Sequence, residues 1–239
     1  MTAFNVEKSL DGLLSALYVS FTDKCIPDRI FSEITPKKRY GVKIVNVATD
    51  KDNAKRVGNA VLSYGGKQLI DKITNCLLSD DERTLDVCFF VCYNTLFYRK
   101  DLSKSTELEK VMQFLCIEDK VVREKNRLIR TLEFNESDGG ILYASIYPES
   151  NVSPLLAPYY YKKYSKLPFV LHDLKRGSIV ASNGYTMHVT DTELKLNLLE
   201  LSNQQQFDKL WKRCYREILL KEKRLNKIAP NKKKNPTTW

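Results

Sequence analysis

The chain has 239 residues, of which 43% are hydrophobic and 28% charged, as is typical of a globular protein. Its nine Gly and eight Pro exclude a collagen-like or linker-dominated chain. No stretch approaches the roughly 20 apolar residues of a membrane span, and the N-terminal segment lacks the apolar region of a signal peptide, so we expect a soluble, cytoplasmic protein that binds no membrane.

The net charge of +10 is concentrated at the C-terminal end of the chain. From Lys212 to Trp239, ten Lys or Arg residues accompany two Glu residues, a charge of +8 that leaves +2 for residues 1–211. Such a segment can release counterions from a phosphate backbone, as nucleic-acid-binding proteins do. A solubilising tail, or a basic face that meets an acidic protein surface, has the same composition. We favour nucleic acid.

The first half of the chain is predicted to be mostly helical. Apolar residues at helical spacing predict an amphipathic helix over 10–24. A loop rich in Pro, Lys and Arg follows, and then a short β-branched strand at 42–47. Thr49 and Asp52 resemble a capping box that starts a helix, which Gly65-Gly66 ends. Further helical patterns cover 67–78, 82–97, 105–115 and 118–132.

Strand patterns appear after residue 134. The alternation over 141–147, after a Gly-containing turn, predicts a hairpin. Ser153 as N-cap and Pro154 at the first helical position start another helix. A strand is expected at 169–172, a hairpin turning at Asn183-Gly184 over 179–189, and a final helix over about 207–226.

Helices followed by helix mixed with hairpins predict an α+β fold with a small antiparallel or mixed sheet, a C-terminal helix and a basic tail. We expect one α+β domain over residues 1–226 and a basic tail over 227–239.

The sequence contains no motif for a cofactor or a metal. It lacks a phosphate-binding loop, a dinucleotide fingerprint and a nucleophile elbow. The six cysteines include no CxxC pair, and only two His are available as further ligands. Cys88 and Cys92 share a helical face, which we interpret as core. We therefore expect no cofactor and no metal site.

The densest pattern is 159–176, where five aromatic residues alternate with five basic ones. Aromatic faces can stack on bases while Lys and Arg contact phosphates. Alternatively, the helix buries Tyr160 and Tyr164 in the core and exposes its lysines, the interpretation we favour for the aromatics. The candidates for a phosphate-facing patch, with a solvated surface as the alternative, are Lys162, Lys163, Lys175 and Arg176.

Candidates for acid–base chemistry are few. His172 could act as a general acid or base, although its neighbour Asp173 points to the opposite face of a strand. A locally satisfied histidine is the alternative, and we favour it. Glu124 and Arg127, three residues apart on a helix, are interpreted first as a surface ion pair.

The order of the motifs resembles a bacterial family described as a probable DNA metabolism protein. The matching segments are LDGLLSALYVSF (10–21), ATDKDNAKRV (48–57), VVREKNRLIR (121–130), GGILYASIYPESNVSPLLAPYY (139–160), FVLHDLKRGS (169–178), FDKLWKRCYREI (207–218) and a terminal Pro-x-x-Trp (236–239). Two histidines typical of that family are replaced here, by Asn126 and Tyr159. The positions that match are Asp11, Gly12, Asp50, Glu124, Arg127, Tyr143, Pro148, His172, Asp173 and Arg176.

The resemblance implies a DNA-linked context. Family members are typically encoded beside a putative DNA-modification or repair radical-SAM protein, and some are fused to a uracil-DNA-glycosylase-superfamily domain. The resemblance therefore implies a radical-SAM partner, but it assigns no reaction.

Three hypotheses follow. The first is a nucleic-acid-binding accessory protein in DNA repair or modification, with DNA preferred to RNA. Its phosphate-binding residues would be Lys162, Lys163, Lys175, Arg176, Arg213, Arg216, Arg224, Lys232, Lys233 and Lys234. The second is a DNA-processing enzyme, a hydrolase or base-modifying activity, with candidate catalytic residues His172, Asp173, Glu124 and Arg127. The third is a scaffold that docks the partner protein without contacting nucleic acid.

Overall fold

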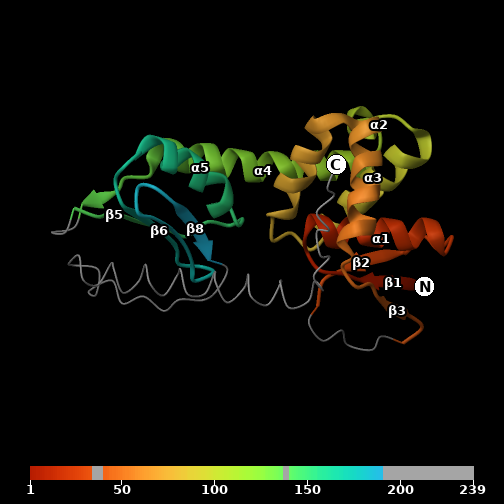
Figure 1. Cartoon of the computed structure of the whole chain (residues 1–239). Helices are drawn as coiled ribbons and strands as arrows, with labels where there is room; N and C mark the ends of the chain where they lie inside the picture. Colours follow the sequence, from red (N-terminus) through yellow and green to blue (C-terminus); the bar gives the residue numbers. More distant parts are fainter. Residues whose placement is uncertain (34–39, 137–139, 191–239) are drawn as a thin grey trace, which may run out of the picture. The chain divides into compact units, whose positions relative to one another are not determined.

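The computed structural model describes residues 1–33, 40–136 and 140–190 (Figure 1). It divides into two compact units, each with its own sheet. Among the described residues, unit 1 holds those within 1–126 and 149–151, and unit 2 holds those within 127–148 and 152–190. The predicted helix over 207–226 and the boundary to a basic tail lie outside the described residues. Within the described residues, every helix is too short or too polar to span a membrane.

The predicted α+β class is confirmed. A largely helical N-terminal region precedes a mixed five-stranded sheet with a helix packed on it. The N-terminal region also carries a small parallel sheet that we did not predict in full.

The sheet of unit 1 has the strand order β2-β1-β3, with all strands parallel. Its strands are β1 (Thr2–Asn5), β2 (Arg29–Phe31) and β3 (Lys43–Asn46). The predicted strand at 42–47 is therefore confirmed. The other two strands were missed because four and three residues are too short to show an alternating pattern.

The helices of unit 1 share one hydrophobic core with this sheet. They are α1 (Leu10–Thr22), α2 (Lys51–Leu77), α3 (Thr84–Tyr98), the short 3-10 turn η1 (Leu102–Lys104) and α4 (Glu109–Thr131), which continues into unit 2. Of these, α3 packs directly on β2. Gly66, at φ 75°, kinks α2 where the sequence predicted a break. The helices predicted at 105–115 and 118–132 are one helix, because Val111, Phe114 and Val121 continue a single buried stripe.

The start of α2 corrects one predicted cap. Asp50 caps the helix, since its Oδ1 accepts hydrogen bonds from the backbone N–H groups of Asp52 and Asn53 at 2.9 and 3.0 Å. The hydroxyl of Thr49 instead donates to Glu7 Oε2 at 2.8 Å. The prediction of Thr49 as the cap was therefore wrong by one residue.

The core of unit 1 joins the inner face of the sheet to the helices. Phe4 and Ile30 of the sheet and Leu13 and Leu17 of α1 are among its fully buried side chains. Cys88 and Cys92 are buried in the same cluster, as their core interpretation predicted. Burial raises the pKa of both thiols, which keeps them protonated.

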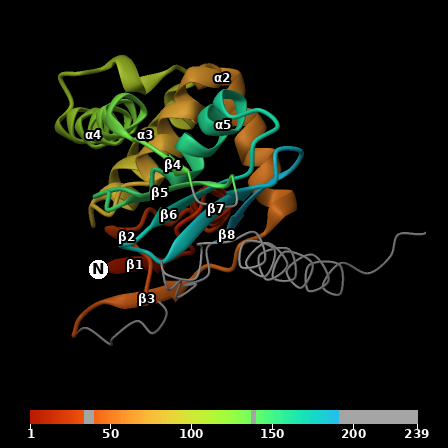
Figure 2. The same cartoon turned by 90° about the vertical axis from the view of Figure 1, so that its left-hand side faces the viewer.

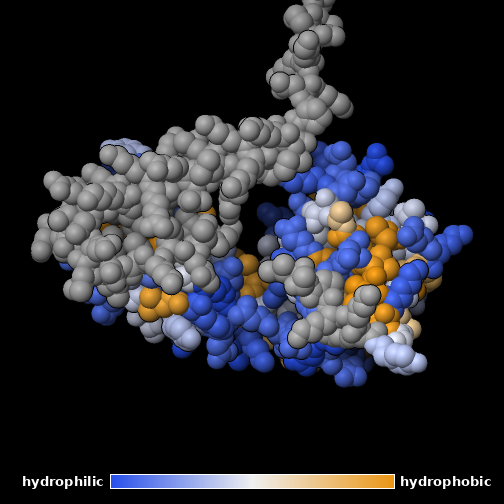
Figure 3. Space-filling model, turned by 90° about the horizontal axis from the view of Figure 1, so that it is seen from below, coloured by the Kyte–Doolittle hydropathy of each residue, from blue (hydrophilic) through white to orange (hydrophobic). Residues whose placement is uncertain are grey.

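The opposite face of the unit 1 sheet is apolar as well. Seen from below the view of Figure 1, hydrophobic side chains gather on the surface of unit 1 (Figure 3). A cavity of about 140 Å³ on the strands is lined by Ala3, Phe31 and Ile44, which alternate with the core residues along the chain.

Unit 2 is built on a five-stranded sheet of order β4-β5-β6-β7-β8, with α5 beside it (Figure 2). The strands β5 and β6 are parallel and the other pairs antiparallel. The elements are β4 (Asn135–Glu136), β5 (Leu142–Ile146), α5 (Ser153–Lys163), β6 (Phe169–Asp173), β7 (Ser178–Ser182) and β8 (Met187–Thr190). Both predicted hairpins, β4–β5 and β7–β8, are confirmed.

The start of α5 differs from the prediction. Val152 occupies the cap position, and the buried hydroxyl of Ser153 has no hydrogen-bond partner among the described residues. Ser153 as a side-chain N-cap was therefore wrong, whereas Pro154 does lie in the first turn.

Aromatic rings hold α5 against the sheet. Tyr160 is fully buried, and its ring lies 4.9 Å from that of Phe134 and 6.0 Å from that of Tyr164. Phe134 also meets Phe169 of β6 edge-on. The core interpretation of Tyr160 is confirmed, and Tyr164 joins the same cluster at partial exposure.

Candidate functional site

His172 and Asp173 end β6 and point to opposite faces of the sheet, as expected for neighbours on a strand. The Nδ1 atom of His172 lies 3.2 Å from the hydroxyl of Tyr143, in a hydrogen bond across β5 and β6. The histidine is only 5% exposed. Burial lowers its pKa, and the nearby Asp173 carboxylate opposes this effect. The surroundings therefore favour a neutral imidazole.

Asp173 is completely buried, and both of its carboxylate oxygens have partners. Its Oδ1 accepts the backbone N–H groups of Lys175 and Arg176 at 2.9 and 3.2 Å, and its Oδ2 pairs with Arg176 Nη1 at 3.0 Å. Arg176 Nη1 also donates to the carbonyl of Pro148 at 3.4 Å. The pair thus fixes the β6–β7 turn to the end of β5.

In unit 1, the carboxylate of Glu124 also holds a loop segment in place. The carboxylate, on α4, accepts the backbone N–H groups of Glu149 and Ser150 at 2.7 and 2.8 Å. The next amide, of Asn151, donates to the carbonyl of Leu78 at 2.8 Å. Glu124 therefore anchors the segment 149–151 to the helices of unit 1.

The four candidate catalytic residues divide between the units. Glu124 belongs to unit 1, and Arg127, His172 and Asp173 belong to unit 2. Arg127 is exposed on α4, and its carbonyl accepts the Thr131 hydroxyl at 3.0 Å.

The candidate phosphate-binding residues of unit 2 also divide, into two pairs. Lys162 and Lys163 lie at the C-terminal end of α5, before β6 begins, and Lys175 and Arg176 lie in the turn where β6 ends. The length of β6, five residues or roughly 13 Å at 3.3 Å per residue, thus separates the two pairs along the chain. The other candidates, Arg213, Arg216, Arg224 and Lys232 to Lys234, lie outside the described residues.

A cluster of exposed aromatic and basic side chains surrounds the C-terminal end of α5, and we call it the aromatic–basic surface. Its members are Tyr159, Lys162, Lys163, Lys166 and Tyr185, all exposed. Lys163 Nζ lies 5.7 and 5.1 Å from the ring centres of Tyr160 and Tyr164, so the underlying rings position its charge.

The β7–β8 turn adds Tyr185 to this surface. The Tyr161 hydroxyl donates to the carbonyl of Tyr185 at 2.7 Å. Gly184, at φ 87°, packs against the backbone of Lys166 so closely that a Cβ would lie 2.6 Å from its carbonyl carbon. Sequence reasoning passed over Tyr185, although the Asn183-Gly184 signal placed it at a hairpin tip.

The charge of this region is one-sided. Residues 152–190 contain five Lys or Arg and one acid, Asp173, which is buried in its ion pair with Arg176. The exposed charge of the region is therefore positive.

Unit 1 holds a cavity of about 340 Å³ beyond the carboxyl ends of β1 and β2, lined in part by Lys8, Arg29, Asp80 and Thr84. Carboxyl ends of parallel strands are a common location for ligands. The Thr84 hydroxyl, at the start of α3, is buried without a partner in the described part of the chain.

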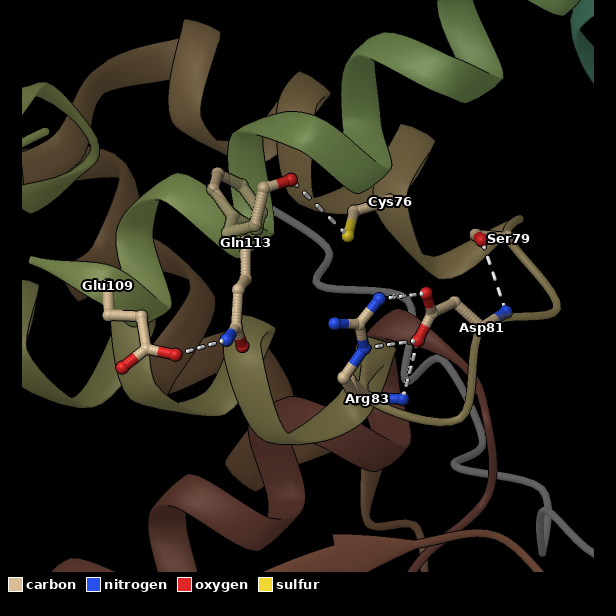
Figure 4. Close-up of polar contacts among 7 residues, drawn as sticks. Cys76, Ser79, Asp81, Arg83, Glu109 and Gln113 are labelled. Carbon is tan, nitrogen blue, oxygen red and sulfur yellow. Dashed lines mark hydrogen bonds and ion pairs between the residues drawn. The ribbon is translucent and has the colours of Figure 1, made fainter.

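The rim of this cavity is held by a local ion pair (Figure 4). Asp81 Oδ1 accepts Arg83 N and Nε at 2.9 and 3.0 Å, and its Oδ2 pairs with Nη2 at 2.7 Å. The hydrogen bond from the Arg83 side chain lowers the pKa of Asp81. No cluster of metal-ligating side chains occurs among the residues that the structure describes.

The chain belongs to the family of the DUF4130 domain, a domain of unknown function, whose family model matches residues 84–233. No curated protein matches the chain.

Two solved structures show weak similarity. One is a pGpG-specific phosphodiesterase, PggH, from Vibrio cholerae, at 10% identity over 92% of this chain and 98% of that one, with a TM-score of 0.35. The other is the DHH domain of a member of the S1p family of ribosomal proteins, at 12% identity over 80% of this chain and 74% of that one, with a TM-score of 0.30. At these scores neither similarity supports a conclusion about fold or activity.

Proposed function

We propose that this protein is a nucleic-acid-binding accessory protein that acts in DNA repair or modification with a radical-SAM partner, and that it prefers DNA to RNA. The observation that carries the proposal is the aromatic–basic surface of unit 2. The charge of +8 between Lys212 and Trp239 adds a second, sequence-based argument. The DNA context and the partner come from the resemblance to the bacterial DNA-metabolism family.

The chemistry of the surface suits a single strand. Tyr185 is 79% exposed and Tyr159 is 41% exposed, so both rings are accessible to bases. Stacking on such rings contributes about 1–3 kcal/mol per base and is tolerant of sequence. The lysines beside them supply counter-charges for phosphates.

The geometry gives little support to an enzyme built on His172, Asp173, Glu124 and Arg127. Asp173 and Glu124 already accept backbone amides, and Asp173 is also ion-paired. A carboxylate engaged in this way is poorly placed to transfer a proton to a substrate.

The C-terminal charge is tested by salt dependence. Binding of the full chain to single- and double-stranded DNA and RNA is measured by fluorescence anisotropy at several salt concentrations. Replacing Lys232, Lys233 and Lys234 with Ala should reduce the slope of log K against log[salt] by up to about three. The control replaces the exposed Lys51, Lys55 and Lys67 of α2 with Ala. An unchanged slope in the C-terminal variant would remove those residues from the interface.

The surface is tested by removing its rings. Tyr185→Ala and Tyr159→Ala should each weaken single-strand binding by about 1–3 kcal/mol, or roughly 5- to 150-fold. Tyr147 is 74% exposed at the other end of β5, so Tyr147→Ala is the matched control. Equal affinity of all three variants and the parent chain would contradict the proposed surface. Salt-stable co-purification with the partner, without nucleic acid binding, would instead support the scaffold hypothesis.

A further inference from the structure

A second cavity of unit 1 lies beside α3 and is walled by aromatic rings. Its volume is about 220 Å³, and its lining includes Phe89, Phe90 and Tyr93 of α3. Pockets for drug-sized ligands typically measure about 300–1,000 Å³, so this cavity suits a smaller group.

The rings at this wall are aligned with one another. Tyr93 lies 5.8 Å from Phe89 at an interplanar angle of 20°, and 4.8 Å from Phe21 of α1 at 12°. These contacts hold the aromatic wall in place, and a flat aromatic ligand can pack against it.

Polar groups of opposite charge line the same cavity. Asp86 is half-buried, and its Oδ1 accepts the Ile30 N–H at 2.5 Å. That is the one hydrogen bond of its carboxylate within the described residues, so the other oxygen can still accept. Lys110, whose charge acts on Asp86, places Nζ 5.2 Å from the centre of the Phe90 ring. The site thus offers an acceptor and a cationic donor beside a stacking wall.

Among the common bases, guanine matches this combination. Its Watson–Crick edge carries two adjacent N–H donors, at N1 and the 2-amino group, and one acceptor, O6. Adenine, cytosine and uracil do not present two neighbouring donors. The second carboxylate oxygen of Asp86 has two lone pairs for these donors, and an ammonium group can donate to O6.

We propose that the cavity beside α3 binds a guanine base, with Asp86 Oδ2 accepting from its N–H groups, Lys110 donating to O6, and the base packed against the aromatic wall. The base can come from a free nucleotide or from an unpaired position in a strand. This site lies in unit 1 alone and does not depend on the proposed function of the unit 2 surface.

The first experiment titrates the full chain with GMP, AMP, CMP and UMP by calorimetry. We expect GMP to bind about tenfold or more tightly than the other three, as one well-formed base contact allows. Equal affinity for all four nucleotides would overturn the assignment to guanine.

A variant with altered base specificity tests whether Asp86 contacts the ligand. Asp86→Asn keeps an acceptor for the Ile30 amide but presents an N–H group to the ligand. It should lose about tenfold or more in affinity for GMP and gain affinity for xanthosine monophosphate, which carries an oxygen in place of the 2-amino group. A gain cannot arise from misfolding. Asp71→Asn, at an exposed position of α2, is the control. Unchanged preference in Asp86→Asn would overturn the proposal.

Two further measurements test whether the base comes from a strand and whether GMP binding is independent of strand binding. An oligothymidine with one central guanine should bind more tightly than oligothymidine alone if the base comes from a strand. Ala at Lys232, Lys233 and Lys234 should weaken both oligonucleotides but leave GMP binding intact. Failure of strand binding with GMP binding retained would refute only the proposed function. If neither GMP nor the guanine-containing strand is preferred, the guanine site is refuted.

Discussion

The two units of this protein use polar and charged side chains in different ways. In unit 1, residues 1–126 carry 20 Lys or Arg and 18 Asp or Glu, a nearly balanced set, and the three cavities described above are lined by this unit. In unit 2, residues 152–190 carry five Lys or Arg and one acid, which is buried, and exposed aromatic rings lie on α5 and on the β7–β8 turn.

The comparison shows that residue type alone is a poor guide to a site. His172, Asp173 and Arg176 have the side chains of a catalytic group, yet they fix strands and turns of unit 2. Phe90 and Tyr93 have the side chains of a core, yet they line a cavity in unit 1. The predictions below test whether this division between the units is real.

The largest effect is expected at the buried ion pair of unit 2. Asp173→Ala leaves the Arg176 guanidinium without its carboxylate and two amides without an acceptor, so it should destabilise the protein by about 3–5 kcal/mol. Urea unfolding measures the change, and the exposed Glu133→Ala is the control. A loss below about 1 kcal/mol would show that the pair is not structural.

The corresponding carboxylate of unit 1 should matter somewhat less. Glu124→Ala removes the acceptor of two amides and should cost about 2–3 kcal/mol. Hydrogen exchange at the amides of Glu149 and Ser150 should accelerate. Arg123→Ala, which removes only the exposed pair with Asp119, should cost about 0.5 kcal/mol or less. Slow exchange at both amides in Glu124→Ala would contradict the anchoring role.

Acid should weaken unit 2 through His172. Burial lowers the pKa of this histidine below its ordinary 6.5, so the unfolded chain takes up a proton at a pH where the folded chain does not. Stability should therefore fall as the pH drops below about 6.5, toward the lower pKa of the folded state. His172→Gln should reduce this loss, as measured by urea unfolding between pH 7 and 5. An unchanged pH profile would show that the imidazole gains its proton in the folded state as readily as in the unfolded one.

The smallest effect is expected at Asp86 of unit 1, where stability should fall as the pH rises. Burial raises the pKa of Asp86 above its ordinary 3.8, so the folded chain holds a proton where the unfolded chain has lost it. Stability falls as the pH rises through this window, and the penalty is constant above it. Asp86→Asn should therefore raise the melting temperature slightly at pH 7, and this advantage should shrink near pH 4. A lower melting temperature at pH 7 would contradict the assignment.

Sequence reasoning succeeded where the local signal was long or chemically specific. The helix α1 is thirteen residues long and carries a continuous apolar stripe, and Asn183-Gly184 marks the β7–β8 turn. Sequence reasoning did not predict β1 and β2, because strands of four and three residues are too short to show a sequence pattern. They form through pairing with neighbouring strands of the sheet.

The sites were harder to predict for the same reason. Lys162 and Lys175 are close in sequence, but β6 separates them. The cavity beside α3 collects residues from the loop before β2, from α3 and from α4, and no local spacing connects these segments. Only the packing of these segments in the fold brings the cavity residues together.

The contact between Gly184 and Lys166 has an entropic consequence for binding. This contact and the Tyr161 hydrogen bond hold the β7–β8 turn in place before any ligand arrives, so little conformational freedom remains to be lost when a base stacks on Tyr185. A side chain at position 184 would push the turn away from the Lys166 backbone. Every ring and every charge of the surface would remain, but the preorganisation of Tyr185 would be lost.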